Sequence, residues 1–214
     1  MDWDALRNRI KTDFDAKNAT REQVLKACRS LVQTSSYIIR SVHRGERDEA
    51  LGLIDQASQL SSSITDMTKD HPEVYTAGFV HDAQKEYAEA RVTYALINSE
   101  PLPEPEELGV EFPAYLNGLG EVVGELRRSI LDLIREGHLG RGDELLSYMD
   151  DIYYLLVSFD YPDAITGGLR RTTDMARAIM ERTRGDLTTT LRQSKLKEAI
   201  FDLERNLKKA SKKD

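Results

Sequence analysis

The sequence predicts an all-α fold, and three observations support this prediction. Only six prolines occur among the 214 residues, and none of them lies inside the long segments with helical periodicity. Leu, Ala, Glu, Arg and Lys, which favour helices, are abundant. Apolar residues recur at alternating spacings of three and four, the pattern of one helix face. No segment is rich in strand-forming residues, so we expect helices throughout.

The beginning of the chain predicts two helices separated by a short break. The first helix covers about residues 3–15, and we expect it to end before the polar residues at 18–20. Thr20 and Gln23 then fit a capping box, in which each side chain bonds an exposed backbone N–H group of the other. The second helix therefore begins just after Thr20 and runs to about His43.

Two further helices are expected before the middle of the chain. Gly45 interrupts the second helix, and a third helix spans about residues 48–67. Asp70 as a cap and Pro72 in the first turn predict the start of a fourth helix. This helix carries a narrow apolar seam for packing against other helices, made of Val80, Ala83, Tyr87, Ala90, Tyr94 and Ile97.

Residues 99–113 form the one long loop that the sequence predicts. They contain four prolines, one glycine and five acidic residues, which disfavour a helix. The loop divides a single helical domain, residues 1–214, into two halves. In the second half, the three-four spacing returns from Leu116 to Leu133 in a fifth helix that ends in the region 137–142. Three more helices are expected at about residues 143–159, 162–184 and 187–210, and residues 208–214 form a basic tail.

Composition and charge restrict the classes of function. The net charge of −7 argues against a protein that coats nucleic acid with its whole surface, so any RNA site must be local. The single cysteine, Cys28, excludes an intramolecular disulfide and a thiolate-rich zinc site, and we expect it to be buried. No apolar run approaches the roughly 20 residues of a membrane span. The acidic N-terminus does not resemble a secretory signal, so we expect a cytoplasmic protein that does not bind membranes.

Two of the expected helices carry a stripe of carboxylates. On the fourth, Asp82, Glu86 and Glu89 fall within an arc of roughly 60°. On the fifth, Glu121 and Glu125 lie one turn apart, opposite the apolar seam. If these helices are neighbours, their oxygen ligands suit a hard cation such as Mg²⁺ or Mn²⁺, which could promote phosphodiester hydrolysis. Spacing alone favours an exposed, salt-bridged helix face over a metal site, because glutamates one turn apart are common on such faces.

Two stretches of the sequence resemble a known family. Residues 115–128, Tyr-Leu-Asn-Gly-Leu-Gly-Glu-Val-Val-Gly-Glu-Leu-Arg-Arg, resemble the most characteristic segment of the translin family. Residues 84–90, Gln-Lys-Glu-Tyr-Ala-Glu-Ala, resemble the paired-glutamate helix of translin-associated factor X, the catalytic branch of that family. Residues 29–44 are similar in the second helix. The resemblance spans about residues 21–184 and implies a seven-helix bundle that assembles into a closed homo-octamer around a cavity.

The resemblance also implies an activity. In the catalytic branch, acidic groups of these two helices hold magnesium inside the cavity. The chain is thus expected to be a Mg²⁺-dependent endoribonuclease for single-stranded RNA, with Mn²⁺ as a possible substitute. One position departs from that branch. The catalytic branch has aspartate where this chain has Glu121, and plain translin has glutamate there, like this chain. The alternative is an inactive oligomer of the translin type that binds single-stranded RNA or DNA. The residues with implied catalytic and metal-ligating roles are Glu86, Glu89, Glu121 and Glu125.

Candidate RNA contacts lie beside these acids and near the end of the second helix. Guanidinium groups form paired hydrogen bonds with phosphate oxygens. Tyr87 and Tyr94 fall on the apolar seam, so we expect them in the core rather than stacked on bases. A structural helical bundle without RNA binding stays open as a third function. The candidate RNA contacts are Arg40, His43, Arg44, Arg47, Arg127 and Arg128, of which the last two could instead pair with neighbouring glutamates.

Overall fold

The structure is a computed structural model that describes residues 2–210, apart from the side chains of residues 207, 209 and 210. The all-α fold is confirmed, since this part of the chain contains only helices and the turns that join them. Residues 211–214 of the expected basic tail lie outside the described residues. The long helices are α1 (Trp3–Arg44), α2 (Arg47–Met67), α4 (Gly78–Asn98), α6 (Phe112–Glu136), α7 (Leu139–Val157) and α9 (Leu169–Ala210). The one-turn helices are α3 (Pro72–Tyr75), α5 (Pro105–Leu108) and α8 (Asp163–Thr166).

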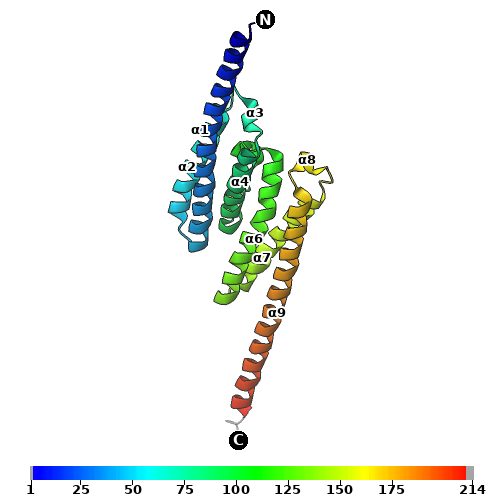
Figure 1. The fold of residues 1–214 in the computed structure, drawn as a ribbon. Coiled ribbons are helices and arrows are strands. Elements are labelled where there is room, and N and C mark those ends of the chain that lie inside the picture. The colour runs from blue at the N-terminus through cyan, green and yellow to red at the C-terminus, as the bar shows by residue number, and fades with distance from the viewer. Residues whose placement is uncertain (1, 211–214) are drawn as a thin grey trace.

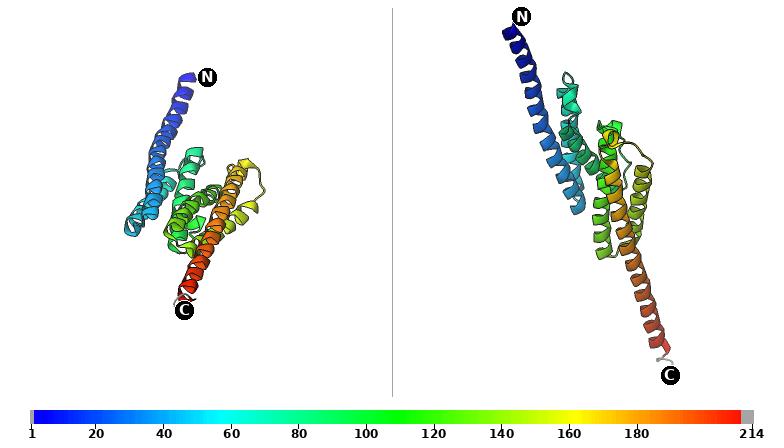
Figure 2. Two further views of the ribbon diagram at one scale, coloured as in Figure 1. Left: turned by 90° about the horizontal axis from the view of Figure 1, so that it is seen from below. Right: turned by 45° about the vertical axis from the view of Figure 1, so that its right-hand side comes forward.

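The long helices pack side by side in an elongated bundle (Figure 1). α1 packs against α2 and α4, α4 packs against α6, and α6 contacts both α7 and α9. Two further views show that the N-terminal end of α1 and the C-terminal end of α9 project from opposite ends of the bundle (Figure 2). The contact between α4 and α6 lies in the middle of the bundle, because α1 packs on the other side of α4 and α7 and α9 pack on the other side of α6.

The expected break at residues 18–20 is wrong, because α1 continues through it. Neither proline nor glycine occurs there, so no residue obliges the chain to leave the helix. Contacts with later helices hold both sides of the expected break. Lys17 Nζ lies 3.6 Å from the carboxylate of Glu73 on α3. The Arg21 guanidinium lies 5.7 Å from the ring centre of Phe79 on α4. The expected capping box is thus in mid-helix, where there is no helix end to cap.

The expected interruption between residues 184 and 187 is also wrong, because α9 is continuous. Two other helices hold α9 at this point. Arg184 pairs with Asp150 of α7 at 2.5 Å, and Asp186 pairs with Arg127 of α6 at 2.8 Å. These contacts offset the weak helix preference of Gly185, which lies in the expected interruption.

Two expected helices instead divide near their starts. The fourth begins as the single turn α3, and the long helix α4 starts only at Gly78. The helix expected at 162–184 begins as α8, which Gly167 and Gly168 separate from α9 with left-handed φ angles of +63° and +87°. The loop at residues 99–113 is confirmed, except that it contains the single turn α5 and that α6 begins at Phe112.

The core contains the apolar seams that the sequence predicts. Tyr87 and Tyr94 are buried, as expected of seam residues. Cys28 is also buried, and this burial raises the pKa of its thiol to about 11, so the thiol is poorly suited to act as a nucleophile. None of the helices within residues 2–210 has the length and apolar character needed to cross a bilayer.

Candidate metal centre

A glycine on α6 allows α4 and α6 to approach closely. A Cβ atom at Gly118 would lie 2.8 Å from the backbone oxygen of Lys85 on α4, and 3.1 Å from both the Cβ of Ala88 and the backbone nitrogen of Glu89. Non-bonded carbon atoms prefer separations of about 3.5–4.0 Å, so only glycine fits without displacing a helix. This approach brings together the carboxylate stripes of the two helices.

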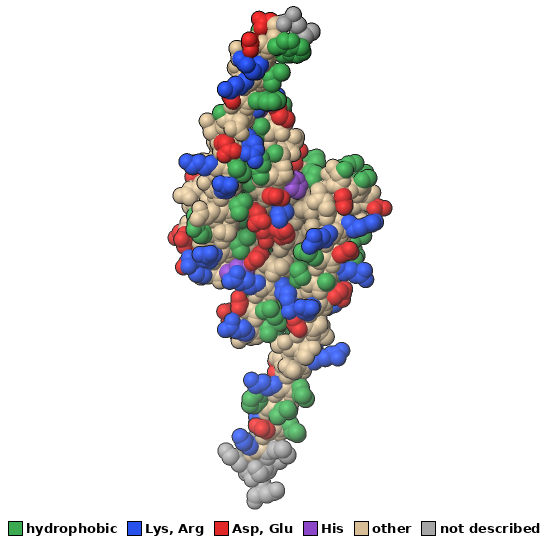
Figure 3. Space-filling model, viewed as in Figure 1, with side chains coloured by type: hydrophobic (Ala, Val, Ile, Leu, Met, Phe, Trp, Pro, Cys, Tyr) green, Lys and Arg blue, Asp and Glu red, His purple; other side chains and the backbone are tan. Residues whose placement is uncertain are grey.

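Three of the four expected metal ligands converge at this contact. One carboxylate oxygen from each of Glu86, Glu89 and Glu121 lies within 4.8 Å of the others. Glu86 and Glu121 are half-buried, whereas Glu89 is only 8% exposed. Figure 3 shows acidic side chains gathered near the middle of this face, with basic side chains around them. Among the described side chains, no second group of this kind is close enough to hold a metal ion. We refer to these three glutamates as the carboxylate triad.

Glu89 differs from the other two members of the carboxylate triad. No described side chain donates a hydrogen bond to its carboxylate or forms an ion pair with it. Burial, followed by the negative charges of the three other glutamates, raises the pKa of Glu89 to about 8. Its carboxyl group is therefore largely protonated at neutral pH. A cation bound beside it would favour the charged form.

This pKa predicts that the metal-free protein loses stability as the pH rises from about 4.5 to 8. Below 4.5, the ordinary pKa of a glutamate, Glu89 is protonated in both the folded and the unfolded chain. Between 4.5 and 8 only the unfolded chain ionises, so the folded chain binds more protons and its free energy of unfolding falls by up to about 1.4 kcal/mol per pH unit. Above 8 the contribution of Glu89 is lost and the curve levels off.

Urea unfolding in the presence of a chelator, repeated across this pH range, measures the effect. Glu89→Gln removes the titrating group and serves as the reference, because the other ionisable groups contribute equally to the pH dependence of stability in both proteins. The stability of wild type should fall relative to Glu89→Gln as the pH rises. Parallel curves would show that Glu89 ionises normally in the fold.

Lys85 is the part of the site that sequence reasoning missed. Its Nζ lies 2.6 Å from Glu121 and 3.4 Å from Glu86, so it contacts two members of the carboxylate triad. Burial opposes its charge, but the hydrogen bond and the charge of Glu121, followed by those of Glu86, outweigh burial and raise the pKa of Lys85. Its position one turn before Glu89 on the same helix face was the available signal.

Glu125, the fourth expected ligand, does not join the carboxylate triad. Its carboxylate instead lies 2.5 Å from Nε2 of His43, which α1 contributes. The His43 side chain is only 4% exposed, and the hydroxyl of Ser129 lies 3.4 Å from its Nδ1. Glu125 is thus fixed beside the triad, near enough for its charge to act on Glu89. His43, expected as an RNA contact, is a buried partner of Glu125 in the structure.

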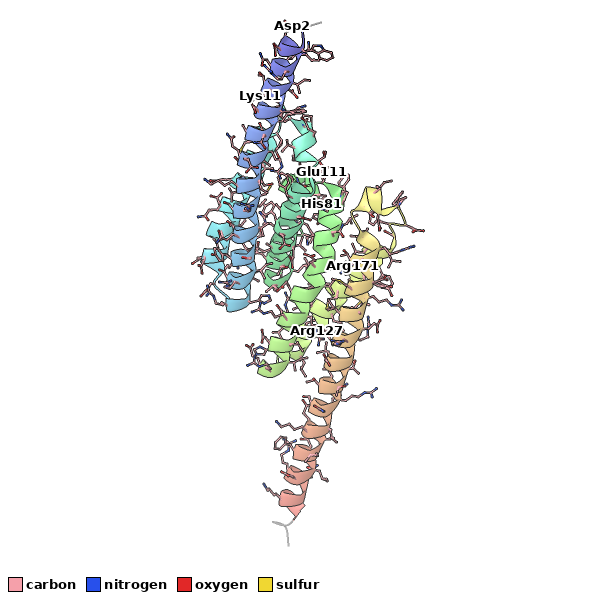
Figure 4. All side chains as sticks on the ribbon, in the orientation of Figure 1. Asp2, Lys11, His81, Glu111, Arg127 and Arg171 are labelled. Carbon is pink, nitrogen blue, oxygen red and sulfur yellow. The ribbon has the colours of Figure 1, made fainter. Side chains whose placement is uncertain are left out.

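The arginines expected to contact RNA form two groups. Arg44, Arg47 and Arg127 each form an ion pair with an acidic side chain, at 2.5, 2.5 and 2.8 Å. Arg127 lies between α6 and α9 (Figure 4), where it also bonds a threonine hydroxyl at 3.0 Å. Arg40 and Arg128 are exposed and have no acidic partner among the described side chains. Only these two guanidinium groups of the expected set are available to a phosphate without breaking an ion pair.

The sequence and the structure are similar to those of known proteins. No family model matches the sequence. The chain is 30% identical over 186 residues to an uncharacterized protein of Methanocaldococcus jannaschii, which corresponds to 86% of this chain and 82% of that protein. A structure of AfC3PO in complex with duplex RNA and a crystal structure of AfC3PO each show 31% identity and a TM-score of 0.80, covering 90% of this chain and 98% of the other. The crystal structure of apo-NeC3PO has a TM-score of 0.77 at 20% identity, covering 86% and 96%, and shares the fold.

These similarities agree with the resemblance first seen in residues 84–90 and 115–128. C3PO assemblies are of the translin type, and both AfC3PO structures match this chain over nearly the whole of their own length. The two segments that carry the resemblance are also the segments that form the contact between α4 and α6. The chain therefore belongs to the translin family.

Proposed function

We propose that this protein is a Mg²⁺-dependent endoribonuclease that works as a closed octamer, as the catalytic branch of the family does. The observation that carries the proposal is the convergence of three carboxylates, one of them buried and without a partner. The ligands offer only oxygen, which suits Mg²⁺ or Mn²⁺ better than zinc. In an octahedral Mg²⁺ site, neighbouring ligand oxygens lie about 3 Å apart, given bonds of about 2.1 Å. The carboxylate triad fits such a site after a small contraction that glutamate side chains readily make.

The ion, when bound, would make a coordinated water more acidic and neutralise charge on the scissile phosphate. The residues of the chain would position both reactants. Glu86, Glu89 and Glu121 would hold the centre, and the ionised form of Glu89 would no longer be disfavoured. Glu125 lies beside the carboxylate triad but is not part of it, and its contact with His43 fixes its orientation. We therefore assign to Glu125 the acceptance of a proton from the attacking water.

RNA binding is supported by AfC3PO, which was solved in complex with duplex RNA. In this chain the available guanidinium groups of Arg40 and Arg128 would contact phosphates of the substrate.

Assembly is supported by large apolar side chains on the projecting helix ends. Trp3 and Phe14 on α1 are 68% and 64% exposed, and Leu196 and Phe201 on α9 are also exposed. Contiguous exposed apolar surface marks a site of protein association.

An inactive RNA-binding oligomer is the second candidate function, and Lys85 favours it. The ammonium group of Lys85 already provides Glu86 and Glu121 with a positive partner. A triad that is partly neutralised by the protein itself could be a structural feature of the contact between α4 and α6.

Removal of divalent metal distinguishes the two candidates. Labelled single-stranded and duplex RNA are incubated with the purified protein in Mg²⁺, in Mn²⁺ or in chelator, and binding is followed by gel shift. We expect cleavage in both metals and none in chelator, with RNA binding retained throughout. Intact RNA in every lane with a clear gel shift would identify the protein as an RNA binder. Light scattering of the same sample tests the octamer, whose mass is eight times 24.3 kDa.

A further inference from the structure

We propose that Lys85 competes with the divalent ion for Glu86 and Glu121, and that its displaced ammonium group then contacts the phosphodiester of bound RNA. The first step concerns ion binding alone and does not require catalysis. The second step rests on the proposed function. Lys85 would therefore stabilise the carboxylate triad before the ion binds and act on the substrate afterwards.

The distances make joint occupancy unfavourable. Lys85 Nζ lies 2.6 Å from a Glu121 carboxylate oxygen and 3.4 Å from one of Glu86. A Mg²⁺ ion on the same Glu121 oxygen would lie about 2.1 Å from it. The two cations would then be at most about 4.7 Å apart, which is the sum of the two contacts, and in a half-buried site their repulsion is weakly screened. Binding of the ion therefore favours displacement of the Lys85 ammonium group.

The charges favour this exchange. The ionised carboxylate triad carries three negative charges, and one ammonium group contacts only two of them. Glu89 then has no partner, although it is the most buried of the three. A divalent ion shared by all three glutamates neutralises one more charge than Lys85 does, and it reaches Glu89 as well. The ion is thus the better partner for the triad, and Lys85 partly substitutes for it.

The backbone and the side chain of Lys85 differ in their freedom to move. The backbone oxygen packs against Gly118 of α6, so the start of the side chain is fixed. The side chain is 21% exposed, and its four-carbon chain can turn the ammonium group toward solvent. After displacement this group remains at the rim of the site, next to Glu86, where a phosphate bound at the metal would lie within its reach.

Ion binding tests the first step without RNA. Mn²⁺ is titrated calorimetrically at pH 8 into wild type, Lys85→Met and Lys85→Gln, with folding checked by thermal unfolding in chelator. We expect Mn²⁺ to bind about tenfold more tightly to both variants, because the competing cation is gone. Lys85→Arg should bind like wild type, since it keeps the charge. Lys69→Met is the matched control, because Lys69 pairs with Asp66 on the surface and should not affect Mn²⁺ binding. Equal or weaker binding by both Lys85 variants would overturn the competition.

Cleavage at saturating Mn²⁺ tests the second step. We expect Lys85→Met to lower kcat by about 10- to 100-fold although it binds the ion more tightly. A lysine that only supported the fold would not change the two measurements in opposite directions. An unchanged kcat would refute the phosphate contact and leave the competition standing on the calorimetric result. If wild type itself does not cleave RNA, the proposed function and the second step both fail, while calorimetry still decides the first.

Discussion

Glu89→Gln should reduce metal-dependent RNA cleavage by about 10²–10³-fold or more while making the metal-free protein more stable. The carboxylate of Glu89 is the buried member of the triad, so it contributes negative charge where solvent cannot replace it. The amide of glutamine has the same size but supplies no charge to an ion. The same substitution removes a group whose ionisation the fold disfavours, since the pKa of Glu89 is raised to about 8. Opposite changes in activity and stability are therefore expected from one substitution.

Initial rates at saturating Mg²⁺, together with urea unfolding at pH 8, measure both changes. Glu106→Gln is a matched control, because Glu106 is exposed on α5 and its carboxylate forms no hydrogen bond or ion pair among the described residues. It should leave both quantities at the wild-type value. Cleavage that persists in Glu89→Gln would remove Glu89 from the catalytic site, and a loss of the RNA gel shift would assign it to RNA binding instead.

Gly118→Ala should destabilise the protein by about 1–3 kcal/mol and weaken Mn²⁺ binding at least tenfold. The new Cβ would lie 2.8 Å from the backbone oxygen of Lys85 and 3.1 Å from the backbone nitrogen of Glu89. Neither atom is at the end of a flexible side chain, so α4 and α6 must move apart, with the cost typical of an overpacked core. Separation of the helices also widens the carboxylate triad, which has ligands on both.

Gly124→Ala is the control for this prediction. Gly124 is also inside α6, but an added Cβ would meet nothing within 4 Å. Alanine favours the helix over glycine, so this variant should be stabilised by up to about 1 kcal/mol. Urea unfolding and Mn²⁺ calorimetry of the two variants give the comparison. If Gly118→Ala behaves like Gly124→Ala, the close approach of the two helices does not control the site.

The sequence predicted the helices better than it predicted their ends. The spacing of apolar residues depends on which face of a helix is buried, and this spacing identified the buried face in the segments that form α4 and α6. The ends were judged from local rules such as the capping box at Thr20, and the last helix was expected to be separate from the one before it. In the structure, contacts with other helices hold the chain in a helix at both places. Contacts of this kind join residues far apart in the chain and are not visible in a local pattern.

The site could be predicted in part for the same reason. The stripes of Glu86, Glu89 and Glu121 follow from spacing within each helix, and the family resemblance suggested that the two helices meet. Spacing could not reveal the pair of His43 and Glu125, which are 82 positions apart. The spacing of Lys85 from Glu89 was a weak signal by itself, because a lysine one turn from a glutamate on a helix is usually solvated. Only the packing of its helix against Gly118 shows that it lies among the acids.

The uninterrupted course of α1 and α9 has a consequence for the thermodynamics of assembly. The first buried residue of α1 is Val24 and the last described one of α9 is Leu187, so about twenty residues at each end are helical without a core of their own. Most helical stability in proteins comes from tertiary packing, so the terminal turns of these segments need little free energy to open locally. A second subunit that covers these turns must therefore order them as well as bind them. Ordering these turns costs conformational entropy, and part of the association free energy offsets that cost. Subunits that bury a large contact area in this way can therefore still dissociate and reassociate.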